Sequence, residues 1–399
     1  MSGAGLIRRG ILSAPSLLAL MSCASEITAV GYAAVDARAF PEAPRYHEQS
    51  DAPGFSLVGE PELYLKSEDN THALSLRPFL RLDSVDPRRT HGDLRRADYV
   101  LSLGAFEVGA GLGQFRWGVL EAHSPSDVLN TPDEVDDLAR TAKLGQPYVE
   151  LAFVSGDWAL RLYALPYARA AQYPGERGRL RFANVVSSTD VLYETALGAW
   201  QPSFAGRFSA TVGSLDLGLG AFTGVAREAR FVAQLTDRHV VPAYDLIHQV
   251  SVDLAWSRSG LDVHLELMGR LWSRSFSVLG AVGLGVEYTF SDLLGTDLTL
   301  VSELHLDSRP NEAPVTIFDH DVFLGLRWAL SDEGGTQLLG GVVLDVIDLR
   351  AYSRVEAGHR FGEHWKLSLQ LNGYFGADGP LESGLLRDNH AQLRLAYYF

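Results

Sequence analysis

Charged side chains recur at every second position in several segments of the sequence, and these are the residues most able to do chemistry. Rows of charge on facing walls would set up an electric field across a water-filled space, and such a field orients and selects ions and polar solutes. The basic row contains Arg77, Arg81, Arg354, Arg360, Lys366 and Arg394, and the acidic row, with one histidine, contains Glu266, Glu287, Glu303 and His305. We predict that these residues line a pore.

Covalent or metal-assisted chemistry finds little support in the sequence. It lacks the Gly-x-Ser-x-Gly nucleophile motif, the phosphate-binding P-loop and the His-Glu-x-x-His zinc motif. The His264–Glu266 and Glu303–His305 pairs could share a metal only if their strands were neighbours, and another strand-like segment separates them. We therefore expect no catalytic residues, no cofactor and no metal site.

The segments that carry the charged rows alternate between apolar and polar side chains. In the segment Trp365–Phe375, apolar residues occupy most odd positions and polar residues most even ones. Successive side chains of a β-strand point to opposite faces, so this pattern predicts a strand with one apolar and one polar face. The same pattern occurs in His72–Asp83, Leu261–Trp272, 297–307, 321–331 and 389–399.

Two features favour a transmembrane β-barrel over a soluble sandwich. Short connections alternate with long ones along the chain, as the periplasmic turns and outer loops of such barrels do. Apolar residues also occupy every second position back from the terminal Phe399, which resembles the assembly signal of bacterial outer-membrane barrels. Because a charge facing lipid costs a few kcal/mol at mid-depth, the charged faces must point inward.

Tryptophan placement supports the same interpretation. Indole rings prefer the headgroup level of a membrane, where they form girdles around a barrel. Six tryptophans lie near predicted strand ends and are expected in such girdles: Trp117, Trp158, Trp256, Trp272, Trp328 and Trp365.

The composition and the N-terminus agree with an exported protein. The chain has 399 residues and a formal net charge of −15, so it lacks the basic stripe of a nucleic-acid-binding protein. Arg8 and Arg9, followed by an apolar stretch and small residues, are typical of a secretory signal peptide, which we place at residues 1–24. Residues 25–399 would then form a single barrel domain. The alternative is that Cys23 is lipidated and becomes the first residue.

Parity constrains the number of strands. Single-chain bacterial barrels have an even number of strands, because both termini lie in the periplasm. About 17 strand-like segments follow residue 55, and the segment 27–40 supplies one more. We predict an all-β, antiparallel up-and-down barrel of about 18 strands, with about 16 as the alternative, and with periplasmic termini.

The connection 119–146 is the most unusual loop. It follows a strand with glycine at alternate positions, which ends in Trp117 and Gly118. Small inward residues leave room for a loop to fold into the barrel, so we predict that 119–146 constricts the pore. The alternative is a loop that lies over the mouth of the barrel.

The same region carries a resemblance to known proteins. Its matching residues are Trp117, Gly118, Asp127, Asn130, Pro132 and Asp133. With these residues the sequence resembles a family of porin-like Gram-negative outer-membrane barrels of unknown substrate. It is more distantly similar, in strand number alone, to barrels of the eighteen-stranded alginate-export type. The resemblance implies a channel in the cell outer membrane and names no solute.

These expectations combine into one functional hypothesis with two alternatives. We expect a channel for passive or weakly selective passage of small polar or charged solutes, and no enzymatic activity. The alternatives are a barrel enzyme acting on outer-membrane lipid and a plugged structural or receptor barrel. Expected partners are outer-membrane lipids and lipopolysaccharide, the barrel assembly machinery and small polar solutes, with no nucleic acid. The sequence does not determine the oligomeric state.

Overall fold

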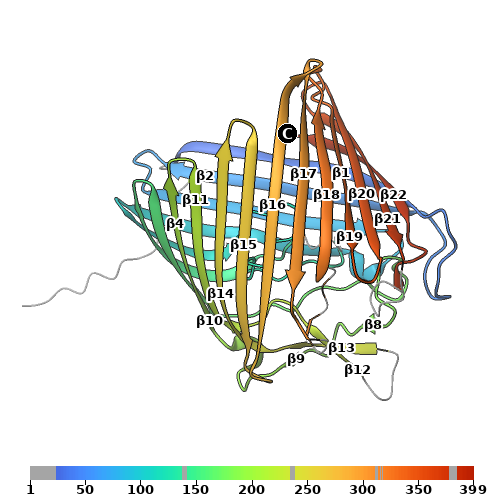
Figure 1. The fold of residues 1–399 in the computed structure, drawn as a ribbon, viewed down its shortest axis with the longest axis horizontal. Coiled ribbons are helices and arrows are strands. Elements are labelled where there is room, and N and C mark those ends of the chain that lie inside the picture. The colour runs from blue at the N-terminus through green and yellow to red at the C-terminus, as the bar shows by residue number, and fades with distance from the viewer. Residues whose placement is uncertain are drawn as a thin grey trace, which may run out of the picture.

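The chain closes into an 18-stranded barrel (Figure 1). The computed structural model describes residues 24–136, 142–233, 239–310, 313–314, 316, 318–376 and 384–399. Each barrel strand pairs antiparallel with its neighbours, and β1 pairs with β22 to complete the ring. The predicted fold class is therefore confirmed with 18 strands rather than 16. The position of the termini relative to the membrane stays a prediction, and the predicted signal sequence lies outside the described residues apart from its last residue.

The first half of the barrel consists of β1 (Ala24–Ala39), β2 (Gly54–Ser67), β3 (His72–Asp83), β4 (His91–Leu103), β5 (Phe106–Gly113), β6 (Gln146–Ser155), β7 (Trp158–Leu165), β10 (Ser203–Val212) and β11 (Leu215–Val225). The second half consists of β14 (Leu246–Arg258), β15 (Leu261–Trp272), β16 (Ser277–Leu293), β17 (Thr296–Asp307), β18 (His320–Ala329), β19 (Gln337–Asp345), β20 (Ala351–Phe361), β21 (Trp365–Phe375) and β22 (His390–Tyr398). In the described connections, two short 3-10 helices are present, η1 (Pro87–Arg89) and η2 (Gly198–Trp200).

Side-chain alternation decides which face of each strand meets the lumen. The predicted segments coincide with β3, β15 and β21. In β17, Leu300, Leu304 and Leu306 are exposed on the outside, while Glu303 and His305 between them face inward and are buried. The period of two that is visible in the sequence is thus the inside–outside period of the wall.

The outer face of the barrel is apolar. Leucine, valine and phenylalanine side chains of most strands are exposed there, which is the reverse of a soluble protein. Hydrocarbon is the solvent that such a face suits, and an outward apolar band is a property of transmembrane barrels. In the described part of the chain, no helix has the length and apolar character needed to cross a membrane.

Only some tryptophans take the predicted girdle positions. Trp158, Trp328 and Trp365 lie at the ends of β7, β18 and β21 and are exposed. For Trp117 and Trp272 the prediction is wrong, because both are buried inside the barrel. They pack in one interior cluster with residues of the connection between β5 and β6.

Short turns and long connections occupy opposite ends of the barrel, as the sequence predicts. The turn between β4 and β5 is residues 104–105, whereas residues 166–202 connect β7 to β10. The long connections contain a small second sheet of β8 (Val185–Val186), β9 (Leu192–Tyr193), β12 (Arg230–Ala233) and β13 (His239–Tyr244). This sheet, which was not predicted, lies at the lower edge of Figure 1.

Phe399 helps to close the barrel. Its backbone N–H donates to the carbonyl oxygen of Gly31 at 3.1 Å, and the Gly31 N–H donates back at 3.1 Å. The Phe399 ring also packs over Gly31, whose missing Cβ would lie 3.2 Å from it. Residue 399 therefore completes the ladder between the first and last strands.

Deletion of Phe399 should lower the yield of folded barrel severalfold, because it removes these closing hydrogen bonds and the terminal ring together. The measurement is the fraction of unheated protein that migrates as a compact band on SDS gels, since a closed barrel resists the detergent until heated. The matched control is Phe361→Ala, which removes another exposed ring. An unchanged yield after the deletion would contradict the assembly role of the C-terminus.

Candidate pore and the loop inside it

The connection between β5 and β6, residues 114–145, lies inside the barrel. Leu120 and Leu129 of this connection are 1% and 0% exposed. Backbone N–H groups at its start donate to Glu266 of β15 and Glu303 of β17, which belong to another part of the wall. The predicted constriction loop 119–146 therefore crosses the lumen, with residues 137–141 outside the described part. That it sets the narrowest section stays a prediction.

Asn130 joins the two ends of this loop. Its side-chain oxygen accepts the Phe115 N–H at 2.7 Å, and its amide nitrogen donates to the carbonyl oxygens of Gly113 at 2.8 Å and Leu144 at 2.9 Å. One buried side chain thus satisfies three backbone groups at the neck of the loop. This requirement explains an asparagine at a position that the resemblance singles out.

The other residues of the resemblance also hold the loop together. Asp127 forms an ion pair with Lys143. Asp133 is fully buried and bonds the ring of His91 at 3.0 Å, and Pro132 forms an isolated β-bridge with Lys143. These residues shape the loop, and none of them lines the free lumen.

Asp136 connects the loop to the basic wall. It pairs with Arg81 at 2.6 Å and with Arg95 at 3.1 Å. Burial by itself would raise the pKa of Asp136, but the guanidinium groups of Arg81, Arg89 and Arg95 outweigh it and hold the pKa at about 2. The carboxylate is therefore ionised, and the ion pairs persist, throughout the physiological pH range.

The predicted acidic wall lies under the loop. Glu266 is 0% exposed, and Glu303 and His305 are 1% and 2% exposed. All three face inward as predicted, but the loop covers them. Glu287 lies nearer the short-turn end of β16 and faces His264 at 3.7 Å and Arg327 at 3.8 Å.

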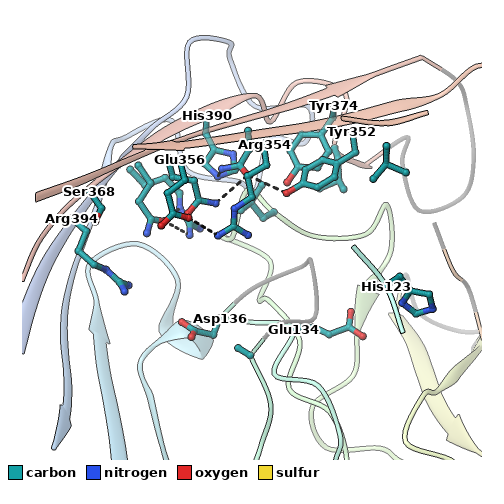
Figure 2. A pocket seen from close by; sticks show the side chains of 18 of the residues that line it. His123, Glu134, Asp136, Tyr352, Arg354, Glu356, Ser368, Tyr374, His390 and Arg394 are labelled. Atoms are coloured by element: carbon teal, nitrogen blue, oxygen red, sulfur yellow. Dashed lines mark hydrogen bonds and ion pairs between the residues drawn. The ribbon is translucent and has the colours of Figure 1, made fainter. Parts of the chain in front are cut away.

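A cavity of about 540 Å³ remains between the loop and the wall around β1, β3, β20, β21 and β22. Figure 2 shows the loop residues on one side of this cavity and the side chains of the closing strands on the other. Its basic lining is Arg38, Arg81, Arg89, Arg95, Arg350, Arg354, Lys366 and Arg394, and its acidic lining is Glu134, Asp136, Asp321, Asp345 and Glu356. Among the described residues that line this cavity, basic side chains therefore outnumber acidic ones.

Several of these cations are held by carboxylates. Arg394 bonds Asp36 at 2.6 Å, and Arg81 bonds the same carboxylate at 2.9 Å. Arg354 lies 3.4 Å from Glu356. Such pairs fix the wall geometry and cancel part of the local field.

Arg38 and Lys366 differ from the other cations. Arg38 donates to the amide oxygen of Gln392 at 2.6 Å, a neutral partner. Among the described residues, no carboxylate forms an ion pair with Arg38 or Lys366. Both side chains line the cavity, so their charges act on whatever enters it.

A hydrogen-bonded network of polar side chains lines the cavity wall near these cations. Asn372 accepts from Gln370 and from the Tyr352 hydroxyl, each at 3.1 Å. Its amide nitrogen donates to His390 at 3.0 Å, and the other ring nitrogen of His390 bonds the Asp388 carbonyl at 2.9 Å. This pattern suits a neutral imidazole. The network leaves amide and phenol groups at the cavity surface, able to bind polar solutes.

Two predicted pore residues lie away from this cavity. Arg77 pairs with Glu60 at 3.2 Å and bonds Gln114, at the root of the loop. Arg360 is exposed at the short-turn end, where its guanidinium lies 5.3 Å from the ring centroid of Tyr398.

Sequence reasoning missed Arg38, Arg95 and Asp136. Arg38 continues the inward period of Asp36 and could have been found from β1 alone. Arg95 escapes the period-two rule, because the register between β3 and β4 shifts by one residue at Pro78. A bulge of this kind re-aims a side chain, here into the lumen.

Three carboxylates gather at the far ends of β18 and β19. Ligand atoms of Asp319, Asp321 and Asp345 lie within 4.8 Å of one another. Arg350 already provides a cation there, bonding Asp345 at 2.8 Å and lying 3.7 Å from Asp319. This arginine neutralises part of the charge of the three carboxylates.

Comparisons with known proteins identify the fold but no close relative. No protein-family profile and no curated protein matches the chain. Among solved structures, OccK3 (OpdO) of Pseudomonas aeruginosa is similar with a TM-score of 0.57 at 10% identity, over 95% of this chain and 97% of that one. Wzi of Escherichia coli, described as an outer-membrane protein involved in capsule assembly and a carbohydrate-binding β-barrel, is similar with a TM-score of 0.54 at 10% identity, over 94% and 84%.

Fold and site together define the class of the protein. A closed 18-stranded antiparallel barrel with an apolar outer face is the architecture of outer-membrane proteins. The chain therefore has the fold of an outer-membrane β-barrel, and its apolar outer face is consistent with a location in the outer membrane.

Proposed function

We propose that the protein is an outer-membrane channel that passes small polar solutes through the part of the lumen beside the loop, with a preference for anions. The observation that carries this proposal is the cavity of about 540 Å³, whose lining includes two cations, Arg38 and Lys366, with no carboxylate partner among the described residues. A barrel of this size encloses more space than its own side chains can fill. The inward loop narrows that space without occupying all of it.

The preference for anions follows from the charges that face the cavity. Arg38 and Lys366 have no carboxylate partner among the described residues, and the low-dielectric wall behind them focuses their field into the lumen. On the opposite side, ion pairs with Arg81 and Arg95 neutralise the charge of Asp136. An anion therefore meets a favourable potential at the wall that carries Arg38 and Lys366.

Planar-bilayer recording of the refolded protein tests this proposal. We expect discrete current steps in KCl and, under a salt gradient, a reversal potential on the anion-selective side. Protein denatured by heat before addition is the control. Absence of conductance from folded barrels would contradict the channel.

A binding barrel is the second candidate, favoured by the loop that crosses the lumen and by the amide and phenol network on the wall. It predicts saturable binding of a hydroxyl-bearing solute to folded protein without ion conductance. The expected lack of enzymatic activity stays a prediction, which hydrolysis of phospholipid micelles by the folded barrel would contradict.

A further inference from the structure

We propose that the inner wall carries a built socket for residues 118–124 of the loop, and that occupation of this socket sets both the width and the charge of the pore. Glu266 and Glu303 are its positioning residues, and Gly283 and Gly285 form its floor. The inference rests on the proposed channel function for its effect on conductance, whereas the socket itself stands on the contacts below.

Glu266 is a buried carboxylate whose partners come from the loop. It accepts the N–H groups of Val119 at 2.6 Å and Leu120 at 3.0 Å, the Ser124 hydroxyl at 2.7 Å and the Ser126 N–H at 3.3 Å. Among the described residues, no cation forms an ion pair with Glu266. Burying a charge is costly unless hydrogen bonds compensate it. A carboxylate at this position is therefore accounted for only when the loop is docked.

Glu303 binds the next two backbone N–H groups of the loop in the same way. It accepts the Glu121 N–H at 2.6 Å and the Ala122 N–H at 3.0 Å, and His305 bonds its second oxygen at 3.0 Å. Together the two carboxylates take the four consecutive backbone N–H groups of residues 119–122. Charge-assisted hydrogen bonds of this kind are stronger than neutral ones.

Leu120 fits a groove that only glycine can leave open. A Cβ on Gly283 would lie 2.1 Å from the Leu120 side chain, and a Cβ on Gly285 would lie 2.9 Å from it. Both glycines are on β16, between the strands that carry the two carboxylates, and Gly283 pairs directly with Glu266. Glycine weakens a strand interior and often marks a close approach of another segment. Here the approaching segment is the loop.

Gly118 allows the loop to turn into the socket. Its φ of +94° is a conformation that other residues rarely adopt. A Cβ there would also lie 1.7 Å from the Ser124 hydroxyl oxygen and 2.5 Å from a Glu266 carboxylate oxygen. The loop and the wall are thus complementary on both sides of the contact.

Docking also determines the charge of the pore. The docked loop holds Asp136 against Arg81 and Arg95. Release of the loop would withdraw this carboxylate from the two arginines, which would keep Asp36 and Glu60 as their partners. Water in the widened lumen would hydrate Glu266 and Glu303, which the docked loop covers, so the released state is a wider pore with two more carboxylates facing the lumen, within an intact barrel.

Two independent variants test the socket. Glu266→Gln with Glu303→Gln keeps side-chain size but turns one acceptor oxygen of each residue into a donor that opposes the loop N–H groups. Gly283→Leu fills the groove and changes no charge. For both we expect a conductance increase of at least about 1.5-fold. In Gly283→Leu we also expect a shift of the reversal potential toward cation selectivity, because the ionised Glu266 and Glu303 then face the lumen. Wild-type conductance and selectivity in both folded variants would overturn the proposal.

Each variant has a matched control on β16. Glu287→Gln removes an inward carboxylate of this strand that accepts no N–H from the described part of the loop, and it should leave the conductance near the wild-type value. Gly280→Leu makes the same change on the outer face of β16, where a Cβ has room, and it should also leave the conductance unchanged. If these controls opened the pore equally, the effect would not come from the socket.

A cross-link separates failure of the socket from failure of the channel. With Cys23→Ser, the pair Leu120→Cys and Gly283→Cys should oxidise readily in the folded barrel, whereas Leu120→Cys with Gly280→Cys should not. In the Glu266→Gln, Glu303→Gln background, oxidation should restore the wild-type conductance and reduction should release it. A cross-link without any conductance would support the socket and contradict the channel. Conductance without a cross-link would support the channel and contradict the socket.

Discussion

Deletion of residues 120–142, with the ends joined by a short glycine linker, should raise single-channel conductance at least about twofold, because the barrel without its inner loop is far wider than the remaining cavity. The loop crosses the lumen from β5 to the wall at β15 and β17, and its buried core includes Leu120 and Leu129. With the loop removed, the path is limited by the barrel wall. The measurement is the step size in planar bilayers in KCl.

Folding of the shortened barrel needs its own control, since the deletion exposes wall groups such as Glu266 and His91. Heat-modifiable migration on SDS gels should be retained, because the strand ladders do not depend on the loop. Exclusion of neutral polymers of graded size gives a second measure of width, and larger polymers should enter the shortened barrel. Unchanged conductance and polymer exclusion would place the narrowest section elsewhere.

Replacement of Arg38, Arg354 and Lys366 by glutamine should shift the reversal potential under a KCl gradient toward cation selectivity, by on the order of 10–20 mV. These three cations line the cavity, and two of them have no carboxylate partner among the described residues. Their removal lowers the positive charge that faces the cavity and leaves Glu356 without its arginine partner. Conductance should change less than selectivity, because glutamine is close in size to the residues it replaces.

Arg360→Gln is the matched control, as this arginine belongs to the same arc but lies exposed beside Tyr398 at the short-turn end. It should leave the reversal potential near the wild-type value. The effect of the triple variant should also shrink as salt is raised, since the Debye length falls from about 30 Å at 0.01 M to about 3 Å at 1 M. A wild-type reversal potential in the triple variant at low salt would remove these residues from the conduction path.

In the structure, Glu266 and Glu303 have a different role from the one that the sequence suggests. From spacing alone these residues form the negative wall of the pore, and their neutralisation should alter selectivity directly. In the structure they hold the loop, so their neutralisation acts first on loop position. The negative side of the cavity is instead supplied by the loop itself, through Glu134 and Asp136 (Figure 2).

The sequence by itself determined the wall of this protein. Alternation with period two follows from the geometry of a single extended strand, so segments such as Leu261–Trp272 and Trp365–Phe375 could be placed without any knowledge of their neighbours. Parity and turn length then led to 18 strands, and the glycine-rich strand before Trp117 indicated a loop that folds inward. Each of these signals is local, and each is imposed by the contrast between lipid outside and water inside.

Only the tertiary structure decided how the interior is arranged. The hydrogen bond from Val119 to Glu266 joins residues 147 positions apart, and no local pattern encodes such a pair. The bulge that turns Arg95 inward depends on the register between two strands. Wall side chains therefore became either pore surface or loop anchor according to what packed against them, because burial and hydrogen bonding in a shared lumen are properties of the closed barrel and not of any one strand.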